Sequence, residues 1–333
     1  MASFFLLIFV KKKPMINSVR NTVLAILNKN NYGYISPSDF NLFAKQAQLD
    51  IFDEYFLGYN SQINKENSRV SGTGYADITK GYEEVIDTFS VTSSLSKLYD
   101  NTYSVPTSAT TGHEYYLLNK ILIYSNVTSS GVTTGINGGN FLVDSTATFQ
   151  TDGVSVGDVV SVVISNSVVT NFKVVAVTSQ TSLQVNIASL TSFGLSYSVY
   201  KPSNLKNEAE FVHNNKITML NKSMLTAPTT TYPAYNQEGL SLTLHPSTIT
   251  DVGRVVSQYI RYPKDPKWTY VMIGGEPIFN NSANDYMDFE LGEEEEVALV
   301  IEICKLAGVS IREADVTNIA MGLETQGAQK ETI

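Results

Sequence analysis

The chain has 333 residues, a net charge of −9, a hydrophobic fraction of 43% and a charged fraction of only 17%. This composition excludes wholesale disorder, and the lack of a basic stripe or patch argues against a protein that grips nucleic acid by neutralising phosphates. The single cysteine, Cys304, excludes a disulfide framework or a Cys-based zinc site within one chain. It lies in an apolar run and is expected to be a small buried hydrophobe.

The first residues combine an apolar run, Phe4 to Val10, with three lysines, Lys11 to Lys13. The run is too short to span a bilayer, and a secretory signal would place its positive charge before the apolar core. We therefore expect residues 1–14 to be a disordered extension, or the product of a mis-assigned start codon, ahead of an ordered chain that opens at Met15. No other stretch is apolar enough to be transmembrane, so a soluble protein without membrane contact is expected.

Two amphipathic helices are predicted to open the ordered chain as a helical hairpin. Residues 17–29 place four apolar side chains on one face at helical spacing, namely Val19, Val23, Ile26 and Leu27. In the second helix, Ser36 is the predicted cap, Pro37 takes the first helical position and Asp39 can reach back to the cap. An apolar stripe follows along the same segment.

A polar stretch and then a β-like stretch follow the hairpin. Residues 60–84 are polar, and the SGTGY segment at 71–75 is expected to be a loop or turn, because Gly72 and Gly74 lack the preceding strand, the third glycine and the lysine of a phosphate-binding loop. From residue 85 to 125 the pattern is typical of strands and ends in an alternating apolar run.

Residues 126–200 have a composition of their own. Charge almost vanishes, and short runs rich in Val, Ser and Thr alternate with turns such as Asp152-Gly153 and Gly157-Asp158. Strands of this length at this spacing predict a small β-sandwich or barrel, inserted as a domain into a helical host.

The host resumes with a predicted central helix over residues 204–223, whose apolar positions are Leu205, Ala209, Val212 and Leu220. A β segment then leads to the proline-rich motif from Tyr262 to Trp268. A lone Trp between lysines could be a ligand platform. We favour the alternative that Trp268 sits in a turn and pins a strand to the core.

The last strong element is a helix that starts at about Glu293. Four glutamates occupy its first turn, where the helix dipole favours negative charge more often than such a run binds a cation. Apolar residues then fill two faces, one with Val297, Val300, Ile301 and Cys304, the other with Leu299, Ile303 and Leu306. A helix that is apolar on two sides is buried in a core or in a subunit interface. Gly308 is expected to end it, before a weaker helix and a polar tail over residues 326–333.

No catalytic constellation is predicted. The three histidines, His113, His213 and His245, share no ligand spacing, and nucleotide-binding, zinc-protease and serine-hydrolase signatures are missing. We therefore expect a protein that is not an enzyme and uses no cofactor or metal.

Three segments carry a resemblance to a known family. They run from Met15 to Phe56, from Arg261 to Val271 and from Asp288 to Glu313. In their order of helical hairpin, proline-rich aromatic turn and acid-led C-terminal helix they resemble the head–tail connector, or neck ring, proteins of tailed, crAss-like bacteriophages. The resemblance implies an α+β fold with a helical connector core over residues 15–125 and 201–325, interrupted by the inserted domain.

The same resemblance implies a virion structural protein of the phage neck, made in the cytoplasm of the bacterial host. Its expected partners are further copies in a twelvefold ring, the portal protein and neighbouring neck or tail proteins. Genomic DNA would pass through the ring without specific binding, which suits a chain of net charge −9. The candidate interface residues are Val297, Val300, Ile301, Ile303, Cys304, Tyr262 and Trp268.

Two other classes stay open. The Ser-, Thr- and Val-rich insertion is also compatible with a carbohydrate- or receptor-binding adhesin or tail fibre, although such chains usually show repeats and no repeat period is found here. A virion-associated hydrolase is the third alternative.

Overall fold

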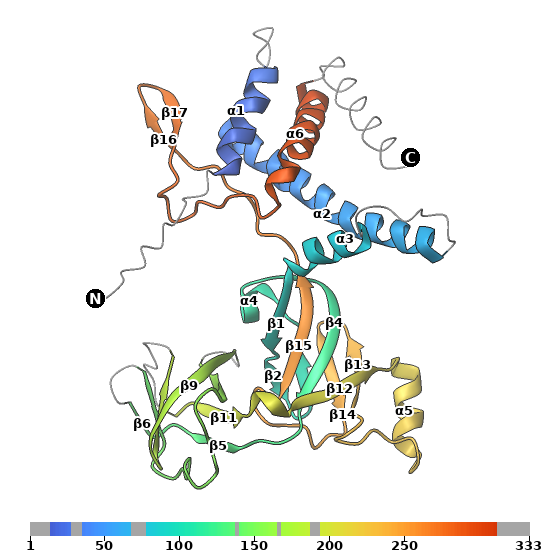
Figure 1. Cartoon of the computed structure of the whole chain (residues 1–333), viewed down its shortest axis with the longest axis vertical. Coiled ribbons are helices and arrows are strands. Elements are labelled where there is room, and N and C mark those ends of the chain that lie inside the picture. Colours follow the sequence, from blue (N-terminus) through green and yellow to red (C-terminus); the bar gives the residue numbers. More distant parts are fainter. Residues whose placement is uncertain are drawn as a thin grey trace, which may run out of the picture. The chain divides into compact units, whose positions relative to one another are not determined.

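The chain has a mixed α+β fold that divides into two compact units (Figure 1). The computed structural model describes residues 14–27, 35–67, 78–136, 140–164, 168–186 and 194–311. One unit, called here the helical unit, comprises residues up to Ile86 together with those from Pro263 on. The other, the β unit, comprises Asp87 to Tyr262. The predicted loop at Gly72 and Gly74, the weaker C-terminal helix and both chain ends lie outside the described residues.

The helical unit is built around its last helix. Its elements are α1 (Met15–Leu27), α2 (Pro37–Asn67), α3 (Ile78–Asp87), a 3-10 turn (Glu293–Glu295), α6 (Glu296–Ile311) and a hairpin of β16 (Tyr270–Ile273) and β17 (Glu276–Phe279). Helix α6 packs against both α1 and α2, and each of these lies closer to α6 than to the other. The two helices of the predicted hairpin therefore pack mainly on α6 rather than on each other.

The start of α2 confirms the predicted capping residues. The Ser36 hydroxyl accepts a hydrogen bond from the backbone N–H of Asp39 at 3.1 Å and donates one to its carboxylate at 2.7 Å. Pro37 is the first helical residue. At the other end of the unit, α6 continues past Gly308 to Ile311, so that glycine does not end the helix as predicted. A glycine within a helix costs about 1 kcal/mol, which the packing on α1 and α2 outweighs.

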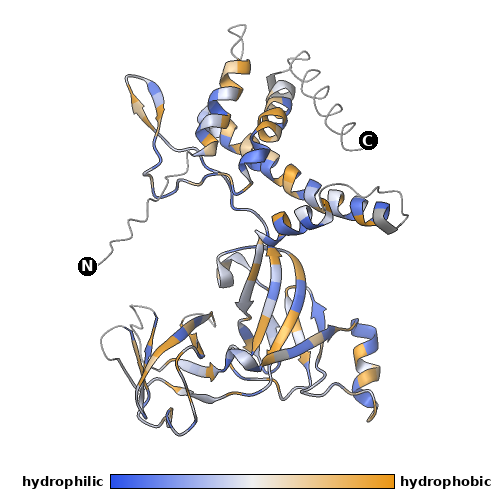
Figure 2. Cartoon of the chain, in the orientation of Figure 1, coloured by the Kyte–Doolittle hydropathy of each residue, from blue (hydrophilic) through white to orange (hydrophobic). Residues whose placement is uncertain are grey.

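The β unit contains a curled eight-stranded sheet in the order β1-β15-β4-β12-β13-β14-β3-β2. Its strands are β1 (Ser90–Ser94), β2 (Lys97–Tyr99), β3 (Thr102–Ser104), β4 (Tyr115–Tyr124), β12 (Leu205–Phe211), β13 (Ala234–Glu238), β14 (Ser241–His245) and β15 (Val255–Arg261). The short helices α4 (Ser108–Thr111) and α5 (Asn214–Lys222) lie in its connections. Figure 2 shows apolar residues gathered along β4 and its neighbours, where Ile121, Ile123 and Val255 are fully buried.

The predicted central helix over residues 204–223 is wrong in its first half. Residues 205–211 form β12, which pairs antiparallel with β4 and parallel with β13. Leu205 and Ala209 also fit a period of two, and the open edge of β4 satisfies the backbone of this segment with a ladder of hydrogen bonds. The helix begins only at Asn214, after His213.

The insertion forms a second, seven-stranded sheet in the order β5-β11-β8-β9-β10-β7-β6. All of its strands lie between residues 129 and 200: β5 (Ser129–Val132), β6 (Gly135–Ile136), β7 (Phe141–Val143), β8 (Val159–Val163), β9 (Val169–Ser179), β10 (Ser182–Val185) and β11 (Ser196–Tyr200). The sheet encloses its own core, which includes Leu142, Phe149 and Leu183. Gly153 and Gly157, at the predicted turns, adopt positive φ angles of 77° and 94°, which glycine tolerates best.

The insertion is joined to the eight-stranded sheet by specific contacts. Tyr124 of β4 stacks on Tyr200 of β11, with ring centroids 4.4 Å apart. The Asn171 side chain of β9 donates to the Ser94 hydroxyl of β1 at 2.8 Å. Gly253 adopts a φ of 67°, and a Cβ there would lie 2.1 Å from the Cβ of Ser161. The junction is thus closely packed, and a side chain at position 253 would force the two sheets apart.

A buried acid organises the core of the insertion. The carboxylate of Asp144 accepts hydrogen bonds from the Tyr197 hydroxyl at 2.7 Å and from the backbone and hydroxyl of Thr146 at 2.9 and 2.7 Å. Burial alone would raise the pKa of Asp144, but these hydrogen bonds outweigh it and hold the pKa below its ordinary value. Burial and the neighbouring carboxylate raise the pKa of Tyr197, which keeps its hydroxyl protonated.

This geometry predicts acid sensitivity of the insertion. A lowered pKa means that Asp144 stabilises the fold above the ordinary carboxyl pKa of about 4, and that the stabilisation is lost as the pH falls through the lowered value. We expect Tyr197→Phe to reduce stability at pH 7 by about 1–3 kcal/mol, because it leaves a buried acceptor short of a donor. Urea unfolding between pH 3 and 7 measures both effects. Tyr99→Phe, at an exposed tyrosine, is the matched control, and equal losses in the two variants would contradict the interpretation.

Candidate functional site

Trp268 is buried in the helical unit, on the segment between β15 and β16. Only 2% of its surface is exposed. Its indole N–H donates to the Asn17 side chain at 3.1 Å, its backbone N–H donates to Asn41 Oδ1 at 2.8 Å, and its carbonyl accepts from Asn41 Nδ2 at 3.2 Å. The guanidinium of Arg20 lies 3.8 Å from the ring centroid. Trp268 therefore pins an extended segment to α1 and α2, and its ring is not free to act as a ligand platform.

The residues on either side of Trp268 are held in the same way. The Gln48 side chain, itself buried, donates to the carbonyl of Lys264 at 2.8 Å and accepts from the backbone N–H of Glu290 at 3.0 Å. The carboxylate of Asp288 accepts from the backbone N–H groups of Met15 and Ile16, at 3.0 and 2.8 Å, and so caps the start of α1. We call residues 263–291 the strap, because side chains of α1 and α2 bind it at both ends.

The seven predicted interface residues separate into two groups. Val300, Ile303 and Cys304 are buried on α6, which packs against α1 and α2, and Trp268 is buried where the strap meets α1 and α2. The remaining three, Val297, Ile301 and Tyr262, keep part of their surface, and Val297 is 69% exposed.

Buried residues of α6 thus come from both predicted apolar faces, and α6 packs against the chain's own helices. Cys304 is one of these buried residues, as its apolar surroundings predict. Burial raises the pKa of the Cys304 thiol to about 11, so the sulfur stays protonated and unreactive near neutral pH.

The hairpin of β16 and β17 is an exposed apolar surface. Each strand pairs only with the other among the described residues. All four residues of β16 are exposed, with Met272 at 58% and Ile273 at 59%, and the turn uses Gly274 and Gly275 at positive φ. Tyr270 and Phe279 stack on Trp268, with centroids 5.6 and 5.9 Å away, which anchors the base of the hairpin to the strap. The Gly-Gly pair after an apolar run signals a tight hairpin turn, but not the exposure of its strands.

A second exposed apolar surface lies in the β unit, on helix α5 and the loop that follows it. We call residues 211–233 the α5 limb. Met224 and Leu225, at the end of the limb, are 102% and 97% exposed, and Met219 and Tyr232 are also exposed. Sequence periodicity missed this surface, because the central helix was predicted to bury one face and the loop is too short to show a period.

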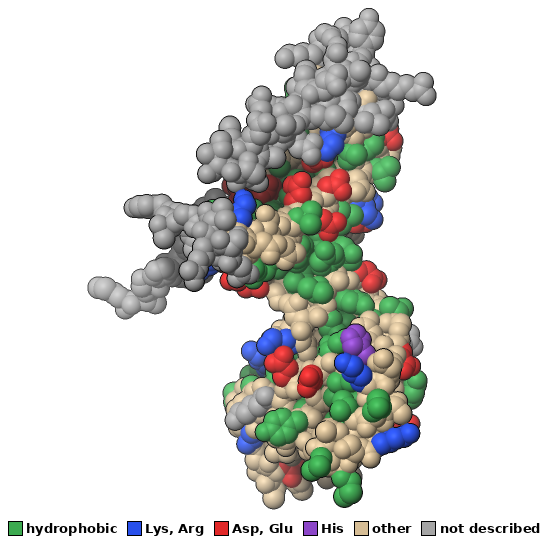
Figure 3. Space-filling model, turned by 90° about the vertical axis from the view of Figure 1, so that its right-hand side faces the viewer, with side chains coloured by type: hydrophobic (Ala, Val, Ile, Leu, Met, Phe, Trp, Pro, Cys, Tyr) green, Lys and Arg blue, Asp and Glu red, His purple; other side chains and the backbone are tan. Residues whose placement is uncertain are grey.

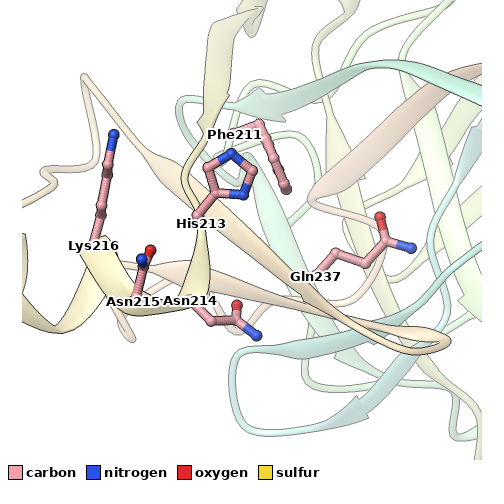
Figure 4. Close-up of a pocket in the computed structure, with 6 residues that line it drawn as sticks. All are labelled: Phe211, His213, Asn214, Asn215, Lys216 and Gln237. Carbon is pink, nitrogen blue, oxygen red and sulfur yellow. The ribbon is translucent and has the colours of Figure 1, made fainter.

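At the base of the limb lies a pocket of about 420 Å³ (Figure 4). Its lining consists of Phe211, His213, Asn214, Asn215, Lys216 and Gln237. Phe211 is half-exposed and meets the His213 ring edge to face, at 5.1 Å. With amide groups, one aromatic face, a histidine and a lysine but no carboxylate, the lining suits hydrogen bonding to a neutral polar group better than binding of a cation.

The other groups considered from the sequence have structural partners or stand apart. His245 hydrogen-bonds the side chains of Asn236 and Asn221, and burial lowers its pKa, so it is neutral near pH 7. Glu293 and Glu294 lie exposed in the turn before α6, as a dipole-complementing helix start predicts. The described part of the chain places no three His, Cys, Asp or Glu side chains where they could jointly hold a metal ion. Among the same residues, none of the helices has the length and apolarity needed to cross a membrane.

No model of a known protein family matches the chain, and a search of characterised proteins finds no match either. The interpretation of these surfaces therefore depends on their own chemistry.

Val300 is buried and Val297 is exposed on the same helix, so substitutions at these two positions form a matched pair. We expect Val300→Glu to destabilise the helical unit by about 3–5 kcal/mol, because it places an unpaired charge against α1 and α2. Val297→Glu is expected to change stability by less than about 0.5 kcal/mol. Thermal unfolding followed by circular dichroism compares them, and a cooperative, unshifted transition in the Val300 variant would contradict the packing. Tests of assembly at this helix should therefore use Val297.

Proposed function

We propose that the chain is a structural subunit of a phage neck, forming a ring between the portal and the tail and lining the channel for DNA. The helical unit would be the connector core of this ring. The three segments that carry the family resemblance support this proposal together, because almost all of their described residues belong to the helical unit. Asn17, Asn41 and Asp288 join them there by side-chain hydrogen bonds. The segments thus form one packed module.

The observation that carries the proposal is the uncovered hairpin. A two-stranded sheet alone is only marginally stable in water, and soluble monomers rarely expose a run of large apolar residues. Here both strands keep an unpaired edge among the described residues, while all four side chains of β16 and that of Ile278 on β17 stay exposed. A neighbouring subunit that adds a strand or covers this face would satisfy both the backbone and the side chains.

The distribution of charge also supports a channel protein. The helical unit has 22 acidic and 14 basic residues, for a net charge of −8, whereas the β unit has 10 and 9. An acidic wall repels phosphates within a Debye length of about 8–10 Å at physiological salt, so a genome slides past without being trapped.

A second candidate function rests on the pocket at Phe211. An exposed aromatic face surrounded by amides is also a suitable site for a saccharide, which favours the adhesin alternative. The pocket belongs to the host sheet and α5, not to the insertion in which a carbohydrate site was anticipated. Glycan-array binding that is lost in Phe211→Ala would support this function, and its absence would leave the neck ring as the better proposal.

Assembly should depend on the hairpin. We expect Met272→Glu/Ile273→Glu to abolish ring formation with little change in unfolding temperature, because both side chains are already exposed within one chain. Mass photometry and negative-stain microscopy of the purified protein, alone and with portal protein, measure the particle mass and symmetry. Glu276→Gln, on the facing strand, is the matched control. A wild-type protein that stays monomeric in the presence of portal would contradict the proposed function.

Assembled rings should bind DNA weakly. In a titration with duplex DNA at low and moderate salt, we expect no submicromolar affinity, because few lysines and arginines are available to release counterions. Tight wild-type binding with a steep salt dependence would indicate a DNA clamp instead.

A further inference from the structure

We propose that the α5 limb is a docking arm that binds the acidic helical unit of a second copy of this chain. This inference rests on the proposed ring and adds to it a specific surface and a specific partner. It starts from Met224 and Leu225, two adjacent large apolar residues that are essentially fully exposed. Loops of this kind are normally polar, and clustered exposed apolar side chains mark sites that another surface covers.

The limb has an ordered base. Ile217 of α5 is buried with Val212 and Ala234 against the sheet. The Asn207 side chain of β12 donates to the carbonyl of Thr230 at 2.8 Å.

The loop that follows α5 is closed by its own hydrogen bonds. The backbone N–H of Ala227 donates to the carbonyl of Ser223 at 2.9 Å, and the N–H of Thr229 donates to the carbonyl of Tyr232 at 3.1 Å. These bonds fix the apolar residues at the end of the limb before any partner binds. A preorganised surface loses less conformational entropy on association.

The charge of the limb points to its partner. Between residues 211 and 233 there are two lysines, Lys216 and Lys222, and no aspartate or glutamate. The helical unit carries most of the chain's negative charge, with exposed carboxylates on Glu83 and Glu84 of α3 and on Glu293 and Glu294 before α6. In Figure 3, acidic side chains are visible on the helical unit, and the visible face of the β unit carries apolar, basic and acidic side chains together.

The apolar, basic limb of one copy would meet the acidic surface of the next copy. Because these are two different surfaces, the contact is head-to-tail. Such heterologous contacts close into a ring when the rotation between neighbours is a whole fraction of a turn. The hairpin lies in the helical unit and the limb in the β unit, so a subunit presents an exposed apolar element from each part.

A limb with two lysines and an apolar end would also suit an anionic bilayer surface. The complementary acidic surface on the same chain favours the second copy.

The test compares assembly in wild type, Met224→Asp/Leu225→Asp and a control, Val156→Asp, which makes the same kind of change at an exposed residue of the insertion. We expect the limb variant to lose the ring, with at least a tenfold weaker association and an unchanged unfolding temperature. The control should assemble normally. Rings that persist in the limb variant would overturn the docking arm but not the neck function, whereas a wild type that fails to assemble would overturn both.

A charge swap tests the identity of the partner. Lys216→Glu/Lys222→Glu should weaken assembly at low salt, and adding Glu293→Lys/Glu294→Lys to the same chain should restore it. Failure of the second pair to restore assembly would contradict this acidic partner surface. Co-flotation of wild type with phosphatidylserine-containing vesicles, lost in Met224→Asp/Leu225→Asp, would show that the limb binds a membrane and would overturn the proposal.

Discussion

The helical unit depends on the attachment of Trp268 to α1 and α2. Helix α1 has only 13 residues, a length at which an isolated helix is marginal, so it needs tertiary contacts. The side chain of Asn41, on helix α2, makes two hydrogen bonds to the backbone of Trp268, in the way that the backbone of a neighbouring strand would. Arg20 covers the ring, a contact worth about 2 kcal/mol when it is desolvated. Because these partners lie more than 200 residues apart along the chain, the unit forms only when its two ends meet.

The insertion is subject to a different constraint. It has its own apolar core and its own buried acid, so most of its interactions are internal. Its position against the eight-stranded sheet, however, depends on the close approach of Gly253 to Ser161 and on the stacked pair of Tyr124 and Tyr200. Excision would expose the face of Tyr124 that this stack covers, so the host sheet has an apolar surface that only the insertion protects. Local composition marks where such a domain begins, but not how firmly it is attached.

Local chemistry was predictable and long-range pairing was not. Ser36, Pro37 and Asp39 form the predicted cap because a helix start is decided within four residues. Leu205 and Ala209 satisfy both a helical and a strand period, and only the open edge of β4, some 80 residues away, decides between them. Trp268 is predicted to pin a strand, and it does pin an extended segment. No sequence pattern, however, identifies the two asparagines that bind it as its partners.

The same distinction explains why the structure separates the seven interface candidates into buried and exposed residues. An apolar pattern on two faces of a helix indicates that both faces are covered, but it does not indicate which molecule covers them. In α6 the covering molecule is largely the chain itself, since Val300, Ile303 and Cys304 are buried and the helix packs against α1 and α2. The apolar residues that the chain leaves uncovered lie instead in a four-residue strand and in a loop after a nine-residue helix. Neither the strand nor the loop is long enough to produce a recognisable hydrophobic period in the sequence. In the proposed assembly, the periodic apolar surface of α6 is covered largely by the chain's own fold, and the surfaces offered to neighbours are short projecting elements that only a structure reveals.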